Sequence, residues 1–535
     1  MTTAGATTAW PWRAPEPSSA QAAFMQGLKL GTRGSLLAIA QSRLVRTALQ
    51  QLHPDLPVEV VTVVTRGDRD QLTPLQDVKD PDFFSAELDV ALLGGRVDFC
   101  VHSLKDLPSV RPAGIATAVL PRRENPRDVI VWRGDVPARL AAGERLRLGS
   151  SSPRRHGNVA DFLAYALPAS GRAPLLDFLP VRGAVDKRLV GLHRPRTAAD
   201  ALDGVVLALA GLARLWSDPD GRKALGPLLA DCRWMVLPLT RCPAAAGQGV
   251  LAVECRADDD RVRNVLRSLH DPDTAELVAV EAAALTGFDS TDRAALGATA
   301  IRHAELGPVC FLRGHTSAGV VERLDWHTPA PPNNAVGFDG LAWQRACTRH
   351  PAGPLPELRT LRPGDAVFAA YWHALQEQTL PPGVRLWVSG VESWRRLAAR
   401  GLWVEGCGDH LGFGDVRATL ECPVLGLPPL RDWTALTYRS AVPGWLESGV
   451  GNVLETYAIL PPADPSVVDS LRESARQATH FYWSSAEQFH ALRPAVPPGA
   501  HHACGAGKTL RVLRAAGTDA RPFPNGREWQ RWVHG

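Results

Sequence analysis

The sequence predicts a multidomain α/β protein whose sheets are largely parallel. Short β-rich runs alternate with amphipathic stretches from residue 28 onward, which is the pattern of layered strands and helices. The chain has 535 residues, too many for one hydrophobic core. Its 45% apolar and 21% charged residues are typical of folded globular chains. No apolar run approaches the roughly 18 residues that a membrane helix needs.

The first part of the chain supplies most of these alternating elements. Strands are expected in LKLGT, VEVVTVVT, DFCVHSLK, GIATAVL, DVIVW and RLRLG, which follow one another between residues 28 and 149. Helices are expected at 35–52, at 85–93 and in SSSPRRHGNVADFLAYAL, which directly follows RLRLG. GVVLALAGLARLW (204–216) predicts a buried strand that passes into a helix.

Two turn-rich stretches divide the chain near residue 355. One is rich in Pro, Asn and Gly (327–340), and the other is rich in Pro (351–363). Strand-like runs return after them, in the order AVFAAYW, VRLWVSG, GLWVEG (401–406), TALTYRS, HFYWSS and HHACGAG. We therefore expect a separate α/β unit in the C-terminal part.

Composition excludes several functional classes. The net charge of +4 over this length gives no nucleic-acid footprint. Nine cysteines without a CxxC pair argue against a disulfide framework and against a zinc site, and we expect no metal. Residues 1–27 lack the charged start and apolar centre of a secretory signal. We expect a disordered leader on a cytoplasmic protein that binds no membrane.

Arginine-bearing loops follow three predicted strands. Arg33 and Ser35 follow the first strand, GSSSPRR places Ser151, Ser152, Arg154 and Arg155 at a helix start, and a later loop carries Arg182 and Arg188. Backbone N–H groups and the helix dipole favour an anion at such a start, and Arg binds carboxylates in bidentate fashion. The simpler interpretation is an ordinary serine N-cap, just as 53 arginines against six lysines fit a GC-rich genome. Together the loops predict a cleft for a polycarboxylate.

The segment VHSLKDLP (101–108) is the most specific. A strand ends in Ser103, Lys105 and Asp106. A carboxylate among cations stays ionised and is suited to stabilising a developing positive charge. The alternative is a loop ion pair between Lys105 and Asp106.

These segments together resemble the porphobilinogen deaminase (hydroxymethylbilane synthase) family. The blocks LGTRGSLLAIAQ, VTRGD, ELDVALL, VHSLKDLP, ENPRD, GSSSPRR, RGAVDKRL, LALAGLARL and PAAAGQGVLAVECR occur in the family's order. The resemblance implies two periplasmic-binding-protein-like lobes and a small α/β third domain. Intertwined lobes 1 and 2 are expected over 28–235, and the lobe 2 return and third domain over 236–350.

The resemblance also implies roles for residues. Asp106 is expected to steady the protonated pyrrole while porphobilinogen loses ammonia and adds to a growing linear tetrapyrrole. The expected binders of acetate and propionate groups are Arg33, Ser35, Ser103, Lys105, Ser151, Ser152, Arg154, Arg155, Arg182 and Arg188. The family's dipyrromethane primer is expected as the cofactor.

Departures from the family pattern bear on activity. The cysteine that carries the primer through a thioether falls on Asp292, the family's lid motif reads Lys79-Asp80-Pro81-Asp82, and Ala184 replaces an Asn. An aspartate cannot form the thioether. Three interpretations stay open: polymerisation on a primer held without a covalent bond, a related reaction on another carboxylated pyrrole, or binding without catalysis.

Residues 351–535 resemble uroporphyrinogen-III synthase, a lyase, less closely. VLETYAILPP, HFYWSSAEQFHAL and HHACGAGKTLRVLRAAG carry that likeness, which implies a two-lobed α/β domain that cyclises the linear tetrapyrrole. The expected cleft residues are Tyr457, Ser484, Ser485 and Thr509. CGAGKTL is not a Walker A loop, because His502 stands where that motif needs Gly. The whole chain thus resembles a multifunctional enzyme of porphyrin and heme biosynthesis.

Overall fold

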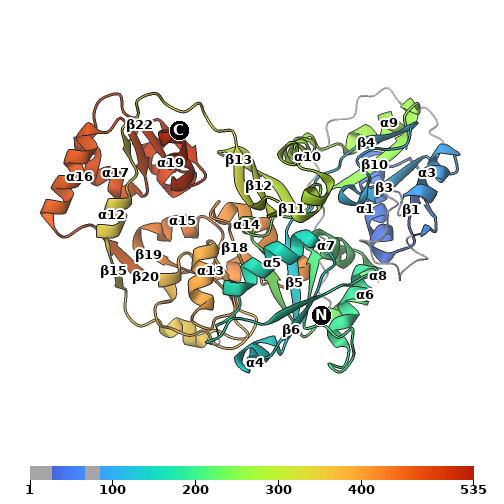
Figure 1. The fold of residues 1–535 in the computed structure, drawn as a ribbon, viewed down its shortest axis with the longest axis horizontal. Helices are drawn as coiled ribbons and strands as arrows, with labels where there is room; N and C mark the ends of the chain where they lie inside the picture. Colours follow the sequence, from blue (N-terminus) through green and yellow to red (C-terminus); the bar gives the residue numbers. More distant parts are fainter. Residues whose placement is uncertain (1–26, 67–84, 170) are drawn as a thin grey trace.

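Five β-sheets organise the part of the chain that the structure describes, which is residues 27–66, 85–169 and 171–535 of a computed structural model. The first sheet and a four-stranded sheet lie at opposite ends of the molecule, with the other three between them (Figure 1). The predicted leader up to residue 26 and the lid stretch from Lys79 to Asp82 lie outside the described residues. The mixed α/β class expected from the sequence is confirmed.

The first sheet has the strand order β2-β1-β3-β10-β4. β1 is parallel to β2 and β3, whereas β10 lies antiparallel between β3 and β4. Helix α1 begins after Ser35, whose side chain accepts a hydrogen bond from the backbone N–H of Ala38. The elements are β1 (Leu28–Thr32), α1 (Leu36–Leu52), β2 (Val58–Thr62), α3 (Ala86–Leu93), β3 (Phe99–Ser103), η2 (Leu104–Asp106), β4 (Ile115–Val119), β10 (Leu251–Arg256) and α9 (Asp260–Leu266).

The second sheet repeats this plan with the order β7-β6-β8-β5-β9. β6 is parallel to β7 and β8, and β5 is antiparallel to β8 and β9. Its strands β5 and β8 are almost wholly buried, as their runs of Val, Ile and Leu predict. The elements are β5 (Asp128–Arg133), α4 (Val136–Ala141), β6 (Leu146–Gly149), α5 (Pro153–Ala166), β7 (Leu176–Leu179), α6 (Val185–Val190), β8 (Gly204–Ala208), α7 (Leu209–Ser217), α8 (Pro219–Leu229) and β9 (Cys232–Val236).

The chain crosses between these two sheets twice. Residues 120–127 lead from β4 to β5, and residues 237–250 lead from β9 back to β10. The return segment that the sequence assigns to lobe 2 therefore enters the first sheet, where β10 pairs with β3 and β4. A third, antiparallel sheet follows, with α10 (Pro272–Ala284) and α11 (Ser290–Ala295) beside β11 (Leu296–His303), β12 (Gly307–Thr316) and β13 (Gly319–Trp326).

A six-stranded sheet with the order β15-β20-β19-β16-β17-β18 opens the C-terminal part. Its strands are β15 (Thr348–Pro351), β16 (Ala366–Ala369), β17 (Arg385–Val388), β18 (Gly406–Cys407), β19 (Thr434–Tyr438) and β20 (Asn452–Leu460), with helices α13 (Val391–Ala398), α14 (Phe413–Leu420) and α15 (Val442–Leu446). The strand expected over 401–406 is wrong for most of its length, because only its last residue belongs to β18. Gly401, at a φ of +80°, forms the turn that ends the preceding helix.

The four-stranded sheet is parallel throughout, with the order β14-β21-β22-β23. Its strands are β14 (Gly337–Phe338), β21 (His480–Trp483), β22 (His501–Gly505) and β23 (Ala520–Phe523). The helices of this unit are α12 (Leu341–Ala346), α16 (Pro465–Gln477), α17 (Ala486–Leu492), α18 (Lys508–Ala515) and α19 (Gly526–His534). β14 and β15 begin before residue 351 yet pair with C-terminal strands, so the C-terminal part starts near residue 337.

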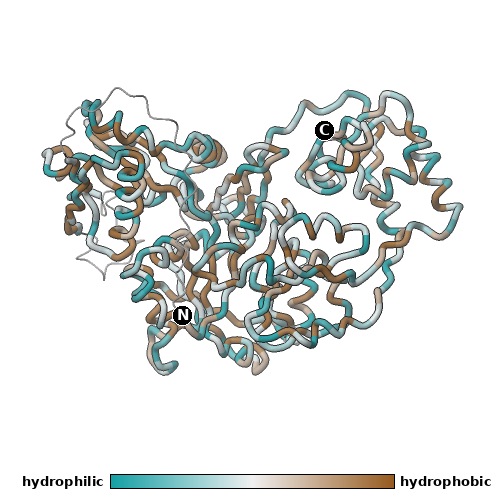
Figure 2. Tube along the Cα trace, turned by 180° about the vertical axis from the view of Figure 1, so that it is seen from behind, coloured by the Kyte–Doolittle hydropathy of each residue, from teal (hydrophilic) through white to brown (hydrophobic). Residues whose placement is uncertain are grey.

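The second sheet and the six-stranded sheet share hydrophobic cores. The Trp394 ring of α13 meets Phe162 of α5 edge-on at 5.0 Å, and its Nε1 donates to the Ala166 carbonyl at 2.9 Å. The backbone N–H of Val236 donates to the Glu405 carbonyl at 2.7 Å. Figure 2 shows apolar segments gathered inside the layers and polar ones along the outer helices and loops. Among the described residues, no helix is both long and apolar enough to span a bilayer.

Candidate active site

A cavity of about 650 Å³ lies between the first and second sheets. Its walls come from the loops at the carboxyl ends of β1, β3 and β7, from α5, α6 and α7, and from the second crossover. Ligands of α/β proteins bind at this end of the strands. Seven cationic side chains line it among the described residues: Arg33, Lys105, Arg155, Arg182, Lys187, Arg188 and Arg214. The two carboxylates in the same lining are Asp106 and Asp186.

Most residues that the sequence predicts for this site line the cavity together. They are Arg33, Ser35, Ser103, Lys105, Asp106, Arg155, Arg182 and Arg188. Asp106 ends the short helix η2, which directly follows β3. Its charge acts on both Lys105 and Arg188, so this carboxylate lies among the cations of the site.

Ser151, Ser152 and Arg154 are not among the residues that line the cavity. Ser151 Oγ donates to the Val181 carbonyl at 2.8 Å and accepts from the Val181 N–H at 2.9 Å. Ser152 caps α5 by accepting from the backbone N–H of Arg155. Arg154 is buried and donates to the Pro243 carbonyl at 2.8 Å. These three side chains hold the wall of the cavity, and the simpler serine-cap interpretation describes Ser152.

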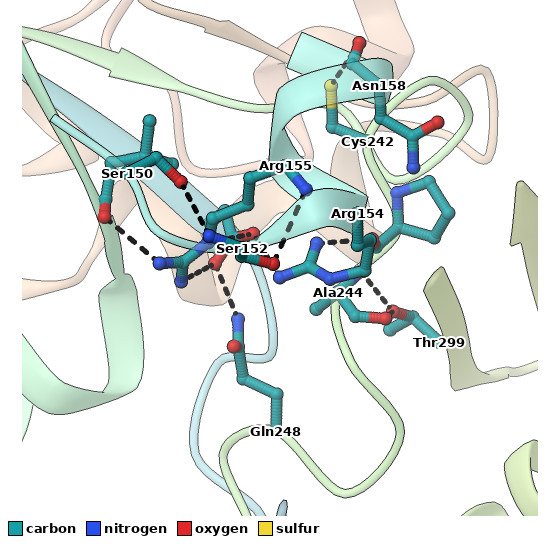
Figure 3. A network of polar contacts seen from close by, with 12 residues as sticks. Ser150, Ser152, Arg154, Arg155, Asn158, Cys242, Ala244, Gln248 and Thr299 are labelled. Atoms are coloured by element: carbon teal, nitrogen blue, oxygen red, sulfur yellow. Dashed lines mark hydrogen bonds and ion pairs between the residues drawn. The ribbon is translucent and has the colours of Figure 1, made fainter. Parts of the chain in front are cut away.

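Asp128 fixes the position of Arg154 and Arg155, which together form a cationic wall that reaches the cavity through Arg155. This fully buried carboxylate pairs with Arg155 at 2.7 Å and with Arg154 at 2.9 Å. Gln248 Nε2 donates to the same carboxylate at 2.9 Å, and Arg155 and Gln248 converge from α5 and from the crossover (Figure 3). Burial alone would raise the pKa of Asp128, but Arg155 and Arg154 outweigh it and hold the pKa below its ordinary value. The pair of arginines is thereby fixed in place.

Lys105 is joined to this network through Gln248, whose Oε1 accepts from the ammonium at 3.0 Å. The surrounding walls desolvate the ammonium and lower the pKa of Lys105 to about 8, with Arg155 adding repulsion and Asp106 opposing it. Burial likewise lowers the pKa of Arg188 to about 10. Neighbouring arginines also lower both pKa values, so an anionic ligand would favour the charged forms of Lys105 and Arg188.

Sequence reasoning missed the charged lining residues Asp186, Lys187 and Arg214 and the amides Gln41 and Gln248. Arg214 is buried in α7, where burial lowers its pKa to about 10, and its Nη2 donates to the Gly249 carbonyl at 2.6 Å. The apolar run around it indicates only a core helix. The single charged residue in LALAGLARL was the available signal, because an Arg buried among apolar residues is rare unless it has a polar partner or ligand.

Two cavity guanidinium groups keep buried donors without a partner among the described residues. These donors are Nη1 of Arg182 and Nε of Arg214. A buried donor left unpaired is costly, and a ligand carboxylate would satisfy it. A ligand with several carboxylate groups therefore fits this lining.

A covalent anchor for dipyrromethane does not fit. Asp292 lies in α11, outside the cavity lining, and its carboxylate accepts from the N–H of Ser317 at 2.8 Å and from its Oγ at 3.2 Å. All nine cysteines fall within the described residues, and none lines the cavity. Cys255 and Cys310, the nearest to Asp292 in sequence, are buried in the first and third sheets.

The candidates in the C-terminal part belong to two different units, one built on the six-stranded sheet and one on the four-stranded sheet. Tyr457 is buried in β20 with its ring 5.7 Å from that of Tyr438, and burial raises its pKa. Ser485 caps α17, and Ser484 Oγ donates to Gln488 at 2.9 Å. Thr509 lies in α18.

Contacts between the two C-terminal sheets occur beside these residues. Lys508 donates to the Ser440 carbonyl and lies 5.2 Å from the centre of the Tyr438 ring. Ser440 Oγ donates to Glu487 at 2.6 Å. The carboxyl end of β19 thus contacts the starts of α17 and α18.

Comparison with known proteins gives consistent relatives for the first part of the chain. The family model described as "Porphobilinogen deaminase, dipyromethane cofactor binding domain" matches residues 28–264. Porphobilinogen deaminase of Sorangium cellulosum (strain So ce56) is 40% identical over 277 residues, which cover 51% of this chain and 82% of that protein. That of Syntrophotalea carbinolica is 36% identical over 311 residues, 58% of this chain and 90% of the relative. That of Roseiflexus castenholzii is 38% identical over 275 residues, with 51% and 81% covered.

Proposed function

The chain belongs to the porphobilinogen deaminase family, and we propose that its first half condenses porphobilinogen to hydroxymethylbilane with release of ammonia, as a transferase of tetrapyrrole biosynthesis. The cavity with cations on both walls and Asp106 among them carries the proposal. The two sheets around it are inferred to be periplasmic-binding-protein-like lobes, with the third sheet as the family's third domain.

Asp106 is assigned to the cationic steps. Porphobilinogen loses its aminomethyl nitrogen as ammonia, which takes the electrons of the C–N bond and leaves an electrophilic azafulvene. The α-carbon of the growing chain's terminal pyrrole attacks the methylene carbon, a C–C bond forms, and the α-proton leaves. After four additions, water adds to the azafulvene end of the released tetrapyrrole and loses one proton, which gives the hydroxymethyl group. A fixed carboxylate stabilises the positive charge on each pyrrole without forming a bond itself.

The cavity cations are assigned to the substrate's carboxylates. Each porphobilinogen brings an acetate and a propionate, and Arg33, Arg182 and Arg188 can bind such groups in bidentate fashion. When bound, a dipyrromethane supplies the first nucleophilic pyrrole. We infer that Asp292 takes the place of its anchoring cysteine, so ion pairs to the cavity hold any primer here.

The competing proposal is a lobe pair that binds a pyrrole or tetrapyrrole carboxylate, or that acts on a different carboxylated pyrrole. Asp292 favours it, since an aspartate forms no thioether. An Asp292→Cys variant separates the two. Porphobilinogen turnover that appears only in this variant supports the binding protein, whereas turnover by the natural chain supports the enzyme.

The role of Asp106 is tested by replacing it. Asp106→Ala is expected to lower ammonia release from porphobilinogen by at least about a hundredfold, the scale on which one electrostatic group contributes. Asp55→Ala, an exposed carboxylate in the loop before β2, is the matched control and should keep full activity. Turnover that survives in Asp106→Ala would remove this carboxylate from the mechanism.

For the C-terminal part we propose a uroporphyrinogen-III synthase-like lyase that closes the linear tetrapyrrole. The support is the pair of α/β sheets that meet beside Tyr438 and Lys508, where Tyr457, Ser484, Ser485 and Thr509 remain candidates. Polar side chains and backbone donors suffice to hold carboxylates while the ring closes. Added hydroxymethylbilane should yield uroporphyrinogen III faster than its spontaneous closure to isomer I.

A further inference from the structure

The two crossovers between the first and second sheets are held by a residue from the C-terminal part. Asp409 lies in the loop between β18 and α14. Its carboxylate pairs with the guanidinium of Arg127, on the first crossover. The same carboxylate accepts from the N–H of Thr240 at 3.0 Å and from its Oγ1 at 2.8 Å, on the second crossover. One side chain therefore ties together both segments that connect the walls of the cavity.

This contact is fully enclosed and conformationally unusual. The side chains of Arg127 and Asp409 are 5% and 0% exposed. Asp409 has a φ of +52°, in the left-handed region that Asp and Asn tolerate better than most residues. A non-glycine residue held in this region indicates that the surroundings fix its position.

The contact also leads directly to the cavity. Arg127 precedes Asp128, the carboxylate that pairs with Arg155 and accepts from Gln248. Gln248 Nε2 also donates to the Pro126 carbonyl at 2.8 Å. The C-terminal part makes a second contact here, where Asn125 Nδ2 donates to Thr419 Oγ1 at 2.8 Å. A shift of residues 125–128 would therefore move the anchor of the cationic wall.

The third sheet binds the same crossovers from another side. Glu281 pairs with Arg123 at 2.5 Å and accepts from the Gly247 N–H at 2.7 Å. Both crossovers are thus tied to α10 as well as to the loop before α14. The ties through Glu281, Asp409 and Thr419 all come from residues beyond the family match at 28–264, but only those through Asp409 and Thr419 come from the C-terminal part.

We propose that Asp409 is a positioning residue for the deaminase reaction: through Arg127 and Thr240 it makes the C-terminal part set the spacing of the two cavity walls. The consequence is that carboxylate binding in the first half depends on the docked C-terminal half. The catalytic consequence rests on the proposed function, whereas the tie between the crossovers does not.

The test uses the full chain with Asp409→Asn. Asn tolerates the same backbone conformation and keeps an oxygen for Thr240, but it loses the charge and presents an amide to Arg127. Glu305→Gln is the matched control, because Glu305 pairs with Arg514 at 2.9 Å and links the third sheet to α18 away from the crossovers.

Amide hydrogen exchange gives the first readout. Exchange at 120–127 and 237–250 is expected to quicken at least about tenfold in Asp409→Asn and to stay within about twofold in Glu305→Gln. Unchanged exchange in folded Asp409→Asn would overturn the tie, whether or not the protein turns over porphobilinogen. If Asp409→Asn does not fold, Thr240→Val decides, since it removes only the hydroxyl donor and should quicken exchange in the second crossover.

Kinetics give the second readout, below the unfolding temperature of each variant. Asp409→Asn is expected to raise KM for porphobilinogen about tenfold with kcat changed less than about twofold, because ground-state binding of carboxylates is what the walls provide. Equal kinetics in wild type and Asp409→Asn would overturn the positioning role. A wild type without turnover refutes the proposed function instead, and the exchange result then still decides the tie.

Discussion

Asp128 and Lys105 illustrate how single residues shape the cavity. Asp128 binds two arginines and Gln248, and Gln248 in turn accepts from Lys105. Removing the carboxylate would leave two buried guanidinium groups with uncompensated charge, which is a costly arrangement. The cationic wall is thus prepared before a ligand arrives.

Lys105 gives the site a pH dependence. The pKa of Lys105 is about 8, so its ammonium loses its proton as the pH rises from 7 to 9. A bound carboxylate favours the charged form, so kcat/KM for porphobilinogen should fall above pH 8, by up to about tenfold per pH unit. Lys105→Arg should lose this fall, because a guanidinium stays charged. Identical profiles for the two proteins would show that another group titrates.

Prediction of single residues from the sequence succeeded where the end of a strand fixes the direction in which the side chains point. Ser103 ends β3, Lys105 and Asp106 follow it, and all three line the cavity as expected. At the start of α5, a cap and an anion site have the same residue pattern, and the helix turns Arg154 into the core but Arg155 toward the cavity. Arg214 was missed because its neighbours are apolar.

At the scale of elements, α5 and α13 form the joint between the second sheet and the six-stranded sheet. Trp394 is fully buried in this joint, and its Nε1 is hydrogen-bonded to the carbonyl end of α5. Its removal creates a cavity and leaves that carbonyl without its donor.

Trp394→Ala is therefore expected to cost about 3–5 kcal/mol of unfolding free energy, the usual range for a buried Trp. Trp372→Ala is the comparison, since this half-buried ring stacks on His373 at 3.5 Å and should cost far less. Urea unfolding followed by circular dichroism measures both. Equal losses would mean that α5 and α13 are not a tight joint.

The strands and helices could be predicted from their alternation along the sequence, but which strands pair with one another could not. The first sheet takes in β10, which follows all five strands of the second sheet and lies far from its partner β3 in sequence. GLWVEG contains strand-forming residues, yet the turn at Gly401 and the packing of Trp403 against Trp132 at 6.4 Å hold most of it outside a sheet.

At the scale of the molecule, the two halves behave as one folded unit. Apolar cores run across the joint, and Arg127, Thr240 and Val236 all bond to residues beyond 400. An exposed stretch between β13 and β14 carries the chain from one half to the other.

A protease site inserted after Asn333 should therefore cut the chain without separating it. The two pieces are expected to co-elute in gel filtration at micromolar concentration, because their interface resembles a domain core rather than a transient contact. The uncut insertion variant is the reference. Pieces that elute separately would show that the halves are tethered rather than docked, and would weaken the role given to Asp409.

The most direct measurement follows porphobilinogen with the purified full-length protein. Its loss is recorded together with ammonia release, and the products are oxidised and separated as uroporphyrin isomers. We expect four porphobilinogens consumed per tetrapyrrole and isomer III as the main product, without a cysteine-anchored primer. A folded protein that consumes no porphobilinogen would contradict the proposal that its first half is a working deaminase.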